Sequence, residues 1–169
     1  LNELSKSSAI HSTLILDNRS SCKFLRTKNE SSRLSNGLKI LKKNIVFEKN
    51  YWKINVAHDG YLKQYGIIHE REIEFYPEQV KFVGHDKILS KSNIKNLMFE
   101  IRFHLEPNIK TMKTQDNKLI LIDLDGEGWK FNSNNNNINI DNGLYFGKKN
   151  SFVDNQNIVI SGMTNDENQ

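Results

Sequence analysis

The fold is decided by the stretch IIHEREIEFY, which runs from Ile67 to Tyr76. Its side chains fall into two alternating sets, one with isoleucine and phenylalanine and the other dominated by glutamate. A period of two is typical of a strand with one face against a core and one face in water. The same period runs through 52–56 and 97–106. The sequence therefore predicts an all-β chain of many short antiparallel strands, with little or no helix.

Turn-forming residues separate these strands. Asn36-Gly37, Asp59-Gly60, Asp125-Gly126 and Asn142-Gly143 can each adopt the left-handed conformations of tight turns. Gly84-His85-Asp86 also looks like a turn. Several of these segments lie between strand-like runs, which predicts hairpins and a β-sandwich or a large curved pair of sheets.

Other segments refine this expectation. Pro77 and Pro107 fall at the ends of strand runs, where a missing N–H does least harm. Leu119 to Leu124 is apolar on both faces, so we expect a strand that is covered on both sides. Only Ser90 to Met98 has a faintly helix-like pattern. The polar residues 164–169 are interpreted as a disordered tail.

The chain has 169 residues, which is enough for one domain with a proper core. We treat 1–169 as a single β-sandwich domain. It begins at Leu1 without an initiator methionine, so we interpret it as a fragment of a larger protein. No apolar run approaches the roughly 20 residues that span a bilayer, and no membrane span is expected.

The net charge is +4 and the pI is about 9.1. Lysines and arginines are scattered, which favours a solvated surface over a dedicated anion site. A basic balance suits acidic polysaccharide as well as nucleic acid, but no nucleic-acid motif is present, so no nucleic acid partner is expected. Cys22 is the single cysteine, which excludes an internal disulfide.

Two charged or titratable residues share the apolar side of the 67–76 strand. His69 and Arg71 alternate with Ile67, Ile73 and Phe75. Burying a charge without partners costs several kcal/mol. Either buried acids satisfy these two residues, or the two line a cleft.

The segment His58-Asp59-Gly60-Tyr61 also has two interpretations. Histidine and tyrosine are common proton carriers in the deprotonation of a carbon acid, so His58 and Tyr61 could form the rim of a site. The structural alternative, which we favour, is a turn in which Asp59 bonds its own backbone and Tyr61 packs as an aromatic cap.

The remaining histidines give weaker signals. His85 is expected in a surface turn, and His104 on the polar face of its strand beside Arg102 and Glu106. His11 opens a strand, but no second metal ligand lies close to it in sequence, and zinc normally takes four ligands.

Six segments, in this order, resemble motifs of heparinase II/III-like proteins, which are polysaccharide lyases and their bacterial relatives. The segments are Ala9–Asp17 (like "AHSTLVLDD"), His58–Tyr61 ("HDGY"), Gly66–Arg71 ("GVLHRR"), Arg102–Pro107 ("RFHLHP"), Asp125–Phe131 ("DGxxWRF") and Asn157–Gly162 ("xIVLSG"). Together they cover nearly the whole chain.

The resemblance implies a supersandwich-like domain that follows an N-terminal α/α toroid, with this chain as its C-terminal portion. The lyases cleave acidic glycans, glycosaminoglycans among them, by β-elimination. A base removes the proton α to the uronate carboxylate, and an acid protonates the leaving oxygen. Those groups come from the toroid and from a segment upstream of this chain. The parent would thus be a carbon–oxygen lyase of the bacterial periplasm or cell envelope, and the fragment alone would be inactive.

The resemblance also bears on metal binding. In metal-containing members the residue that corresponds to His11 is a zinc ligand, and its partners lie upstream. It therefore implies zinc in the whole parent and none in this fragment, because one ligand cannot hold the ion. Two departures weaken other assignments: Glu106 replaces a histidine, and Glu70 stands where a second arginine is common.

The leading hypothesis is a β-sandwich domain that braces the toroid and forms one wall of a cleft for acidic polysaccharide. His58, Tyr61, His69 and Arg71 are the candidate cleft residues. The alternatives are a non-catalytic glycan-binding or scaffold domain, and a free-standing carbohydrate-binding module.

Overall fold

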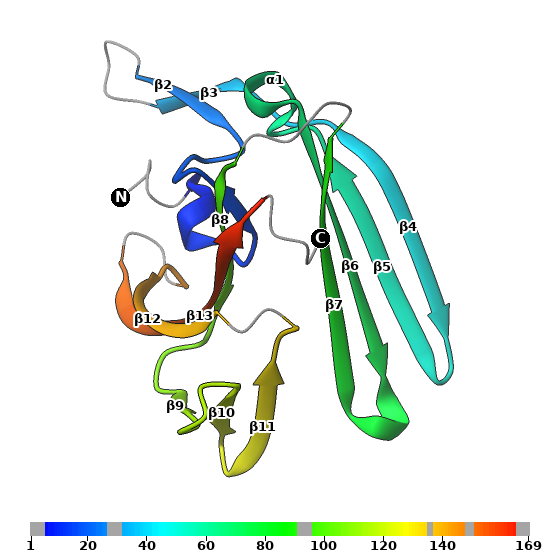
Figure 1. Ribbon diagram of the computed structural model, residues 1–169, viewed down its shortest axis with the longest axis vertical. Helices are drawn as coiled ribbons and strands as arrows, with labels where there is room; N and C mark the ends of the chain where they lie inside the picture. The colour runs from blue at the N-terminus through cyan, green and yellow to red at the C-terminus, as the bar shows by residue number, and fades with distance from the viewer. Residues whose placement is uncertain (1–5, 27–31, 91–95, 135–136, 148–150, 165–169) are drawn as a thin grey trace.

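The computed structural model describes residues 6–26, 32–90, 96–134, 137–147 and 151–164 (Figure 1). They form thirteen strands in four antiparallel sheets and one four-residue helix, α1 (Leu62–Tyr65). The predicted all-β sandwich with little helix is therefore confirmed. Within these ranges, no helix is long and apolar enough to cross a membrane.

A four-stranded layer consists of two long hairpins in the order β4-β5-β6-β7 (Figure 1). Its strands are β4 (Ile40–Glu48), β5 (Tyr51–His58), β6 (Ile67–Tyr76) and β7 (Lys81–Ser90). Direct cross-strand partners share one face of a sheet. We call one face of this layer the inner face. Its rows are Phe47–Trp52–Phe75–Phe82, Ile45–Ile54–Ile73–Gly84, Lys43–Val56–Arg71–Asp86 and His58–His69–Ile88.

The outer face of the same layer is a polar ladder built on the glutamates of β6. Glu70 accepts hydrogen bonds from Lys42 Nζ at 2.9 Å and from Asn55 Nδ2 at 3.0 Å. The next two glutamates along β6 are bonded by Asn55 and by two tyrosine hydroxyls. The alternation of 67–76 thus separates a face that pairs its own charges from a face that is mainly apolar.

The facing layer has the strand order β1-β8-β13-β12, and two smaller sheets, β2-β3 and β9-β10-β11, adjoin the layers. The strands are β1 (Leu14–Leu16), β2 (Lys23–Arg26), β3 (Ser32–Asn36), β8 (Met98–His104), β9 (Lys110–Lys113), β10 (Leu119–Leu124), β11 (Glu127–Asn132), β12 (Ile138–Tyr145) and β13 (Val153–Met163).

Two buried clusters hold these layers together. The first joins Leu14 and Leu16 of β1 to Tyr61, Ile67 and Leu97. The second joins β10, β12 and β13 through Ile120, Ile138 and Ile158. Because the first cluster contains residues of both large layers, it forms the core of the sandwich next to the candidate site.

Three of the predicted turns are wrong, and two of these segments lie inside strands. Gly84, His85 and Asp86 lie in the middle of β7, with His85 exposed and Asp86 directed to the inner face. Asp86 pairs there with the partly buried Arg71, which favours the extended backbone over a turn. Asn142-Gly143 lies inside β12 and pairs with β13. Gly143 is required because a Cβ would meet Asn157 Nδ2 at 2.1 Å.

Other predictions have mixed outcomes. Asp125 (φ 51°) and Gly126 (φ 88°) form the left-handed turn between β10 and β11, as expected. Asn36 is the last residue of β3, and 37–39 do not form a turn. The strand 119–124 is not covered on both sides, since Leu124 is 41% exposed.

The last two predictions fall partly outside the described residues. In the predicted tail, Thr164 is buried, accepts a hydrogen bond from Leu97 N–H and is therefore ordered, whereas 165–169 lie outside those ranges. Most of the helix-like segment, 91–95, also lies outside them, and its end Met98 begins β8.

Candidate functional site

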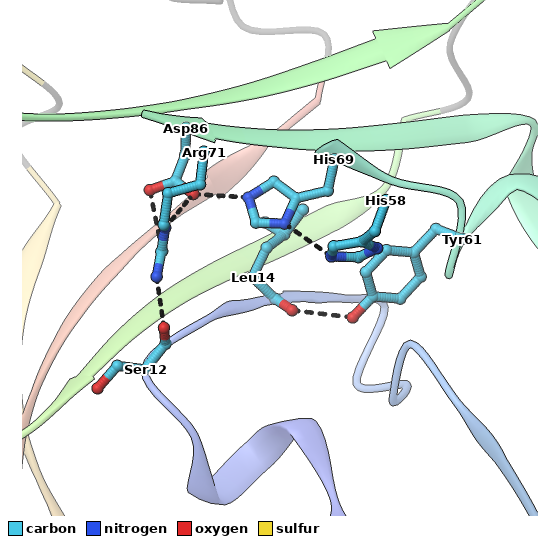
Figure 2. Close-up of polar contacts among 7 residues, drawn as sticks. All are labelled: Ser12, Leu14, His58, Tyr61, His69, Arg71 and Asp86. Carbon is cyan, nitrogen blue, oxygen red and sulfur yellow. Dashed lines mark hydrogen bonds and ion pairs between the residues drawn. The ribbon is translucent and has the colours of Figure 1, made fainter. Parts of the chain in front are cut away.

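Sheet register brings three of the four candidate residues together. His58 ends β5 and is the direct partner of His69 in β6, and Arg71 lies two residues further along β6 on the same face. Tyr61 follows the turn at Asp59-Gly60 and precedes α1. Figure 2 shows the side chains in a row that runs from His58 through His69 and Asp86 to Arg71.

Asp86 is the centre of this row. Its carboxylate accepts hydrogen bonds from His69 Nε2 at 2.6 Å, from Arg71 Nε at 2.7 Å and from Arg71 Nη2 at 3.0 Å (Figure 2). The Arg71 contacts are bidentate, the strongest arrangement for this pair. The side chains of His69 and Asp86 are only 3% and 10% exposed. Of the two interpretations of His69 and Arg71, the structure thus shows that a buried acid satisfies both.

The hydrogen bonds also fix the tautomers of the two imidazoles. Gly60 N–H donates to His58 Nδ1 at 3.1 Å, so this nitrogen carries no proton. A neutral His58 ring is then protonated on Nε2, which donates to His69 Nδ1 at 3.2 Å. His69 therefore carries its own proton on Nε2 and donates it to Asp86. In this arrangement all donors point one way along the row.

Burial and hydrogen bonding together set the pKa values of His58 and Asp86. Burial, reinforced by the neighbouring His69, lowers the pKa of His58 to about 4. Burial alone would raise the pKa of Asp86, but hydrogen bonds from His69 and Arg71 outweigh it and hold that pKa below its ordinary value. At neutral pH the His58 ring is thus neutral, and the Asp86 carboxylate is ionised beside the Arg71 guanidinium.

Arg71 also connects the two layers. Its Nη1 donates to the carbonyl oxygen of Ser12, in the connection that precedes β1 (Figure 2). Its guanidinium carbon lies 5.5 Å from the centre of the Phe103 ring of β8, within cation–π range. The Asp86–Arg71 pair therefore ties the inner face of β4–β7 to the segment that carries His11.

Tyr61 is part of the core. Its side chain has no exposed surface, and its hydroxyl lies 2.9 Å from the Leu14 carbonyl and 3.1 Å from the Arg19 carbonyl. Burial raises the pKa of Tyr61 to about 12. The expected aromatic cap is deeper than predicted, and Asp59 accepts from Lys39 N–H at 2.6 Å rather than from its own backbone.

The segment before β1 is held from two directions. Besides the Arg71 contact, Ser12 Oγ accepts from His104 N–H at 2.9 Å, and His104 Nε2 lies 3.2 Å from the Ala9 carbonyl. His104, predicted as a surface residue beside Arg102, is half-buried and contacts this segment instead. Burial lowers the pKa of His104.

The imidazole of His11 is exposed, and no described residue is hydrogen-bonded to it. It is thus free to act as one metal ligand. Within the described ranges, no group of three histidine, cysteine, aspartate or glutamate residues could hold a metal ion. Zinc at His11 therefore stays a prediction of the family resemblance, and it would need ligands from outside the described residues.

This arrangement is suited to holding the segment rather than to moving protons. Neither imidazole of the row keeps a ring nitrogen free of hydrogen bonds to described residues, and Tyr61 has no exposed surface. Whether the four candidates contact a glycan in the whole protein stays a prediction. A shallow cavity of about 310 Å³ lies apart from the row, on β9–β11, with Met112 and Trp129 in its wall.

Sequence reasoning missed Asp86 and Ser12. Asp86 was assigned to a turn, although its two-residue spacing from Gly84 and Ile88 fits a strand face. The signal that could have found it is a cation on an apolar strand face: Arg71, once partly buried there, favours an acid from a neighbouring strand. Ser12 contributes its main-chain carbonyl oxygen, and a contact of this kind cannot be predicted from the pattern of side chains.

Comparison with family models identifies the region that this chain matches. The model described as "Heparinase II/III-like, C-terminal" matches residues 1–169, the whole chain. No curated protein and no solved structure matches.

Proposed function

Since this chain belongs to the heparinase II/III-like family, whose C-terminal region it matches throughout, we propose that it is the C-terminal β-sandwich domain of a polysaccharide lyase. In this proposal it braces an N-terminal α/α toroid and forms one wall of a cleft for acidic glycan. The family match over all 169 residues is the observation that carries the proposal.

The reaction we propose for the whole protein is β-elimination. A base removes the proton α to a uronate carboxylate, the bond from the β-carbon to the glycosidic oxygen breaks, and an acid protonates that oxygen. The products are an unsaturated uronate end and a free hydroxyl. The base and acid come from outside this chain, which agrees with the occupied nitrogens of His58 and His69.

Within this scheme, we propose that the candidate residues support the cleft wall from behind. Asp86 holds the Arg71 guanidinium, and Arg71 holds the Ser12 carbonyl, next to His11. Tyr61 fastens the start of β1 to the core, and His58 and His69 help to hold the Asp86 carboxylate in place. His11 would supply one ligand to a zinc ion, which would stabilise the wall when bound. We also propose a periplasmic or cell-envelope location, which fractionation of expressing cells would test.

The decisive experiment uses the whole protein and a panel of acidic glycans, including glycosaminoglycans. β-Elimination creates a carbon–carbon double bond conjugated to a carboxylate, so activity appears as a rise in ultraviolet absorbance. Because no water is consumed, mass spectrometry should show that the product masses add up to the mass of the substrate. Asp86→Asn should lower turnover with Asp154→Asn, an exposed aspartate of β13, as the control. Cleavage that adds water to the product would refute the lyase assignment.

The second candidate is a non-catalytic glycan-binding or scaffold domain. The observation that favours it is the commitment of every candidate side chain to internal contacts. A whole protein that binds acidic glycan in calorimetry but releases no unsaturated product would support this alternative.

A further inference from the structure

The inner face of β4–β7 is covered at one end and bare at the other. Its His58–His69–Ile88 end packs against β1 and β8 through the buried cluster of Leu14, Leu16 and Ile67. Figure 1 shows β4–β7 as one layer that extends away from this contact. The two rows at the far end are exposed: Phe47 is 84%, Ile45 55%, Phe82 53% and Ile54 39% exposed.

The bare rows contain aromatic rings in mutual contact. Phe75 and Phe82 stack with ring centroids 4.4 Å apart, and Trp52 lies 5.6 Å from Phe75. From the facing side, Trp129 of β11 lies 6.1 Å from Phe82. Large contiguous apolar patches are rare on free surfaces and mark interaction sites. The outer face of the same strands pairs its charges in a ladder, so the layer has one side suited to water and one side suited to burial.

The chemistry of the bare rows identifies the class of partner. The Phe47 and Ile45 rows carry no charged side chain. An acidic glycan would therefore find no counter-charge there, whereas an apolar protein layer would bury these side chains as β1 and β8 bury the other end. The face is continuous with that established packing interface, so the same kind of layer fits it.

Two observations favour a layer from the same protein over a second copy of this chain. The edge strand β4 carries Lys43 on the inner face, and an inward-pointing lysine opposes a second copy that would extend the sheet by pairing with this edge. The family match describes a C-terminal domain, and a layer tethered in the same chain has an effective concentration in the millimolar range.

We infer that the bare rows around Phe47 are the docking face for the part of the same protein that lies N-terminal to this domain. The inference deepens the proposed bracing role and rests on it only for the identity of the partner. It specifies the contact surface: an apolar layer packs over Phe47, Ile45, Ile54 and Phe82, and the sandwich core extends along β4–β7.

Thiol labelling in the whole protein tests this inference. Phe47→Cys is introduced into a Cys22→Ser background and labelled with a maleimide, and each rate is divided by the rate for the same variant in denaturant. Met112→Cys in β9 (61% exposed) and Val153→Cys in β13 (49% exposed) are the reference sites. Because a covered face is reached only by local opening, Phe47→Cys should react at least about tenfold more slowly than both references. If Phe47→Cys prevents folding, Ile45→Cys is used in its place.

Each alternative occupant has its own result. Equal labelling at Phe47→Cys and the references overturns the inference, because the face is then free. Protection that appears only at concentrations where sedimentation detects a dimer assigns the face to a second copy and also overturns it. Protection that requires an added sulfated glycosaminoglycan assigns the face to glycan, with the same consequence. Labelling needs no catalysis, so a protein that lacks lyase activity but protects Phe47→Cys would refute the proposed function alone.

Discussion

Replacement of Asp86 by asparagine should remove most of the stability that the buried row supplies. Asparagine keeps one acceptor oxygen, but its amide group would face the donors of Arg71 and His69, and the Arg71 charge would lose its counter-ion. Breaking a buried pair typically costs about 3–5 kcal/mol. Since one acceptor survives, we expect about 3 kcal/mol. With a urea m-value of about 2 kcal/mol per molar, the unfolding midpoint should fall by about 1.5 M.

Urea titration at neutral pH, followed by tryptophan fluorescence, measures this loss. Asp154→Asn is the matched control, and its effect should stay within about 0.5 kcal/mol because Asp154 is exposed. A double-mutant cycle with Arg71→Met separates the pair from its surroundings, and the coupling between the two sites should exceed about 1 kcal/mol. If Asp86→Asn costs no more than Asp154→Asn, the row does not stabilise the fold as argued.

The pH dependence of stability in the same variant shows in which direction the contribution of Asp86 changes with pH. The pKa of Asp86 is lower in the folded state than its ordinary value. The unfolded chain therefore binds a proton first as the pH falls, and the contribution of Asp86 is lost as the pH falls through the lowered folded pKa. The difference between wild type and Asp86→Asn should be constant near neutral pH and shrink only in acid.

Three further substitutions test other parts of the structure. Gly143→Ala should destabilise the fold by about 2 kcal/mol in chemical denaturation, because the new methyl group would overlap two buried asparagine side chains. The control Gly128→Ala should have a much smaller effect, because its methyl group would meet nothing within 4 Å. Tyr61→Phe should cost about 1–2 kcal/mol by leaving a buried carbonyl without its donor, and Tyr65→Phe should cost less; equal losses would contradict the core position of Tyr61. His58→Gln should flatten the dependence of stability on pH between about pH 6.5 and pH 4. Because the folded pKa of His58 is about 4, the wild type should lose about 1–2 kcal/mol of stability as the pH falls through that window, after allowance for the partial exposure of the ring. An unchanged slope would show that His58 is not buried in its neutral form.

The sequence predicts the strands of this fold better than their connections. Alternation over 67–76 is a local property, so β6 and its two faces could be read directly. The Gly84-His85-Asp86 segment could not, because its turn-like composition hides a strand whose aspartate is fixed by Arg71, fifteen residues away in sequence. Asn142-Gly143 failed for a related reason: its glycine makes room for side chains of β13 and does not turn the chain.

The candidate site shows the same division. That His69 and Arg71 need partners follows from the cost of burying polar groups, and the sequence supplied that expectation. Which partners they have depends on register across β5, β6 and β7, and register is set by long-range pairing. The direction of the donors in the row depends on one backbone N–H, that of Gly60, which carries no side-chain signal.

The placement of Asn142-Gly143 inside β12 has a consequence for the chemical lifetime of the protein. Asparagine followed by glycine is the dipeptide most prone to deamidation, because the glycine nitrogen can attack the asparagine amide and close a five-membered imide. That attack needs a bent backbone, whereas pairing of Asn142 with Gln156 and of Gly143 with Asn155 holds this dipeptide extended. Ageing at this position should therefore report the opening of β12 from β13, and intact Asn142 after prolonged storage would indicate that this strand pair rarely separates.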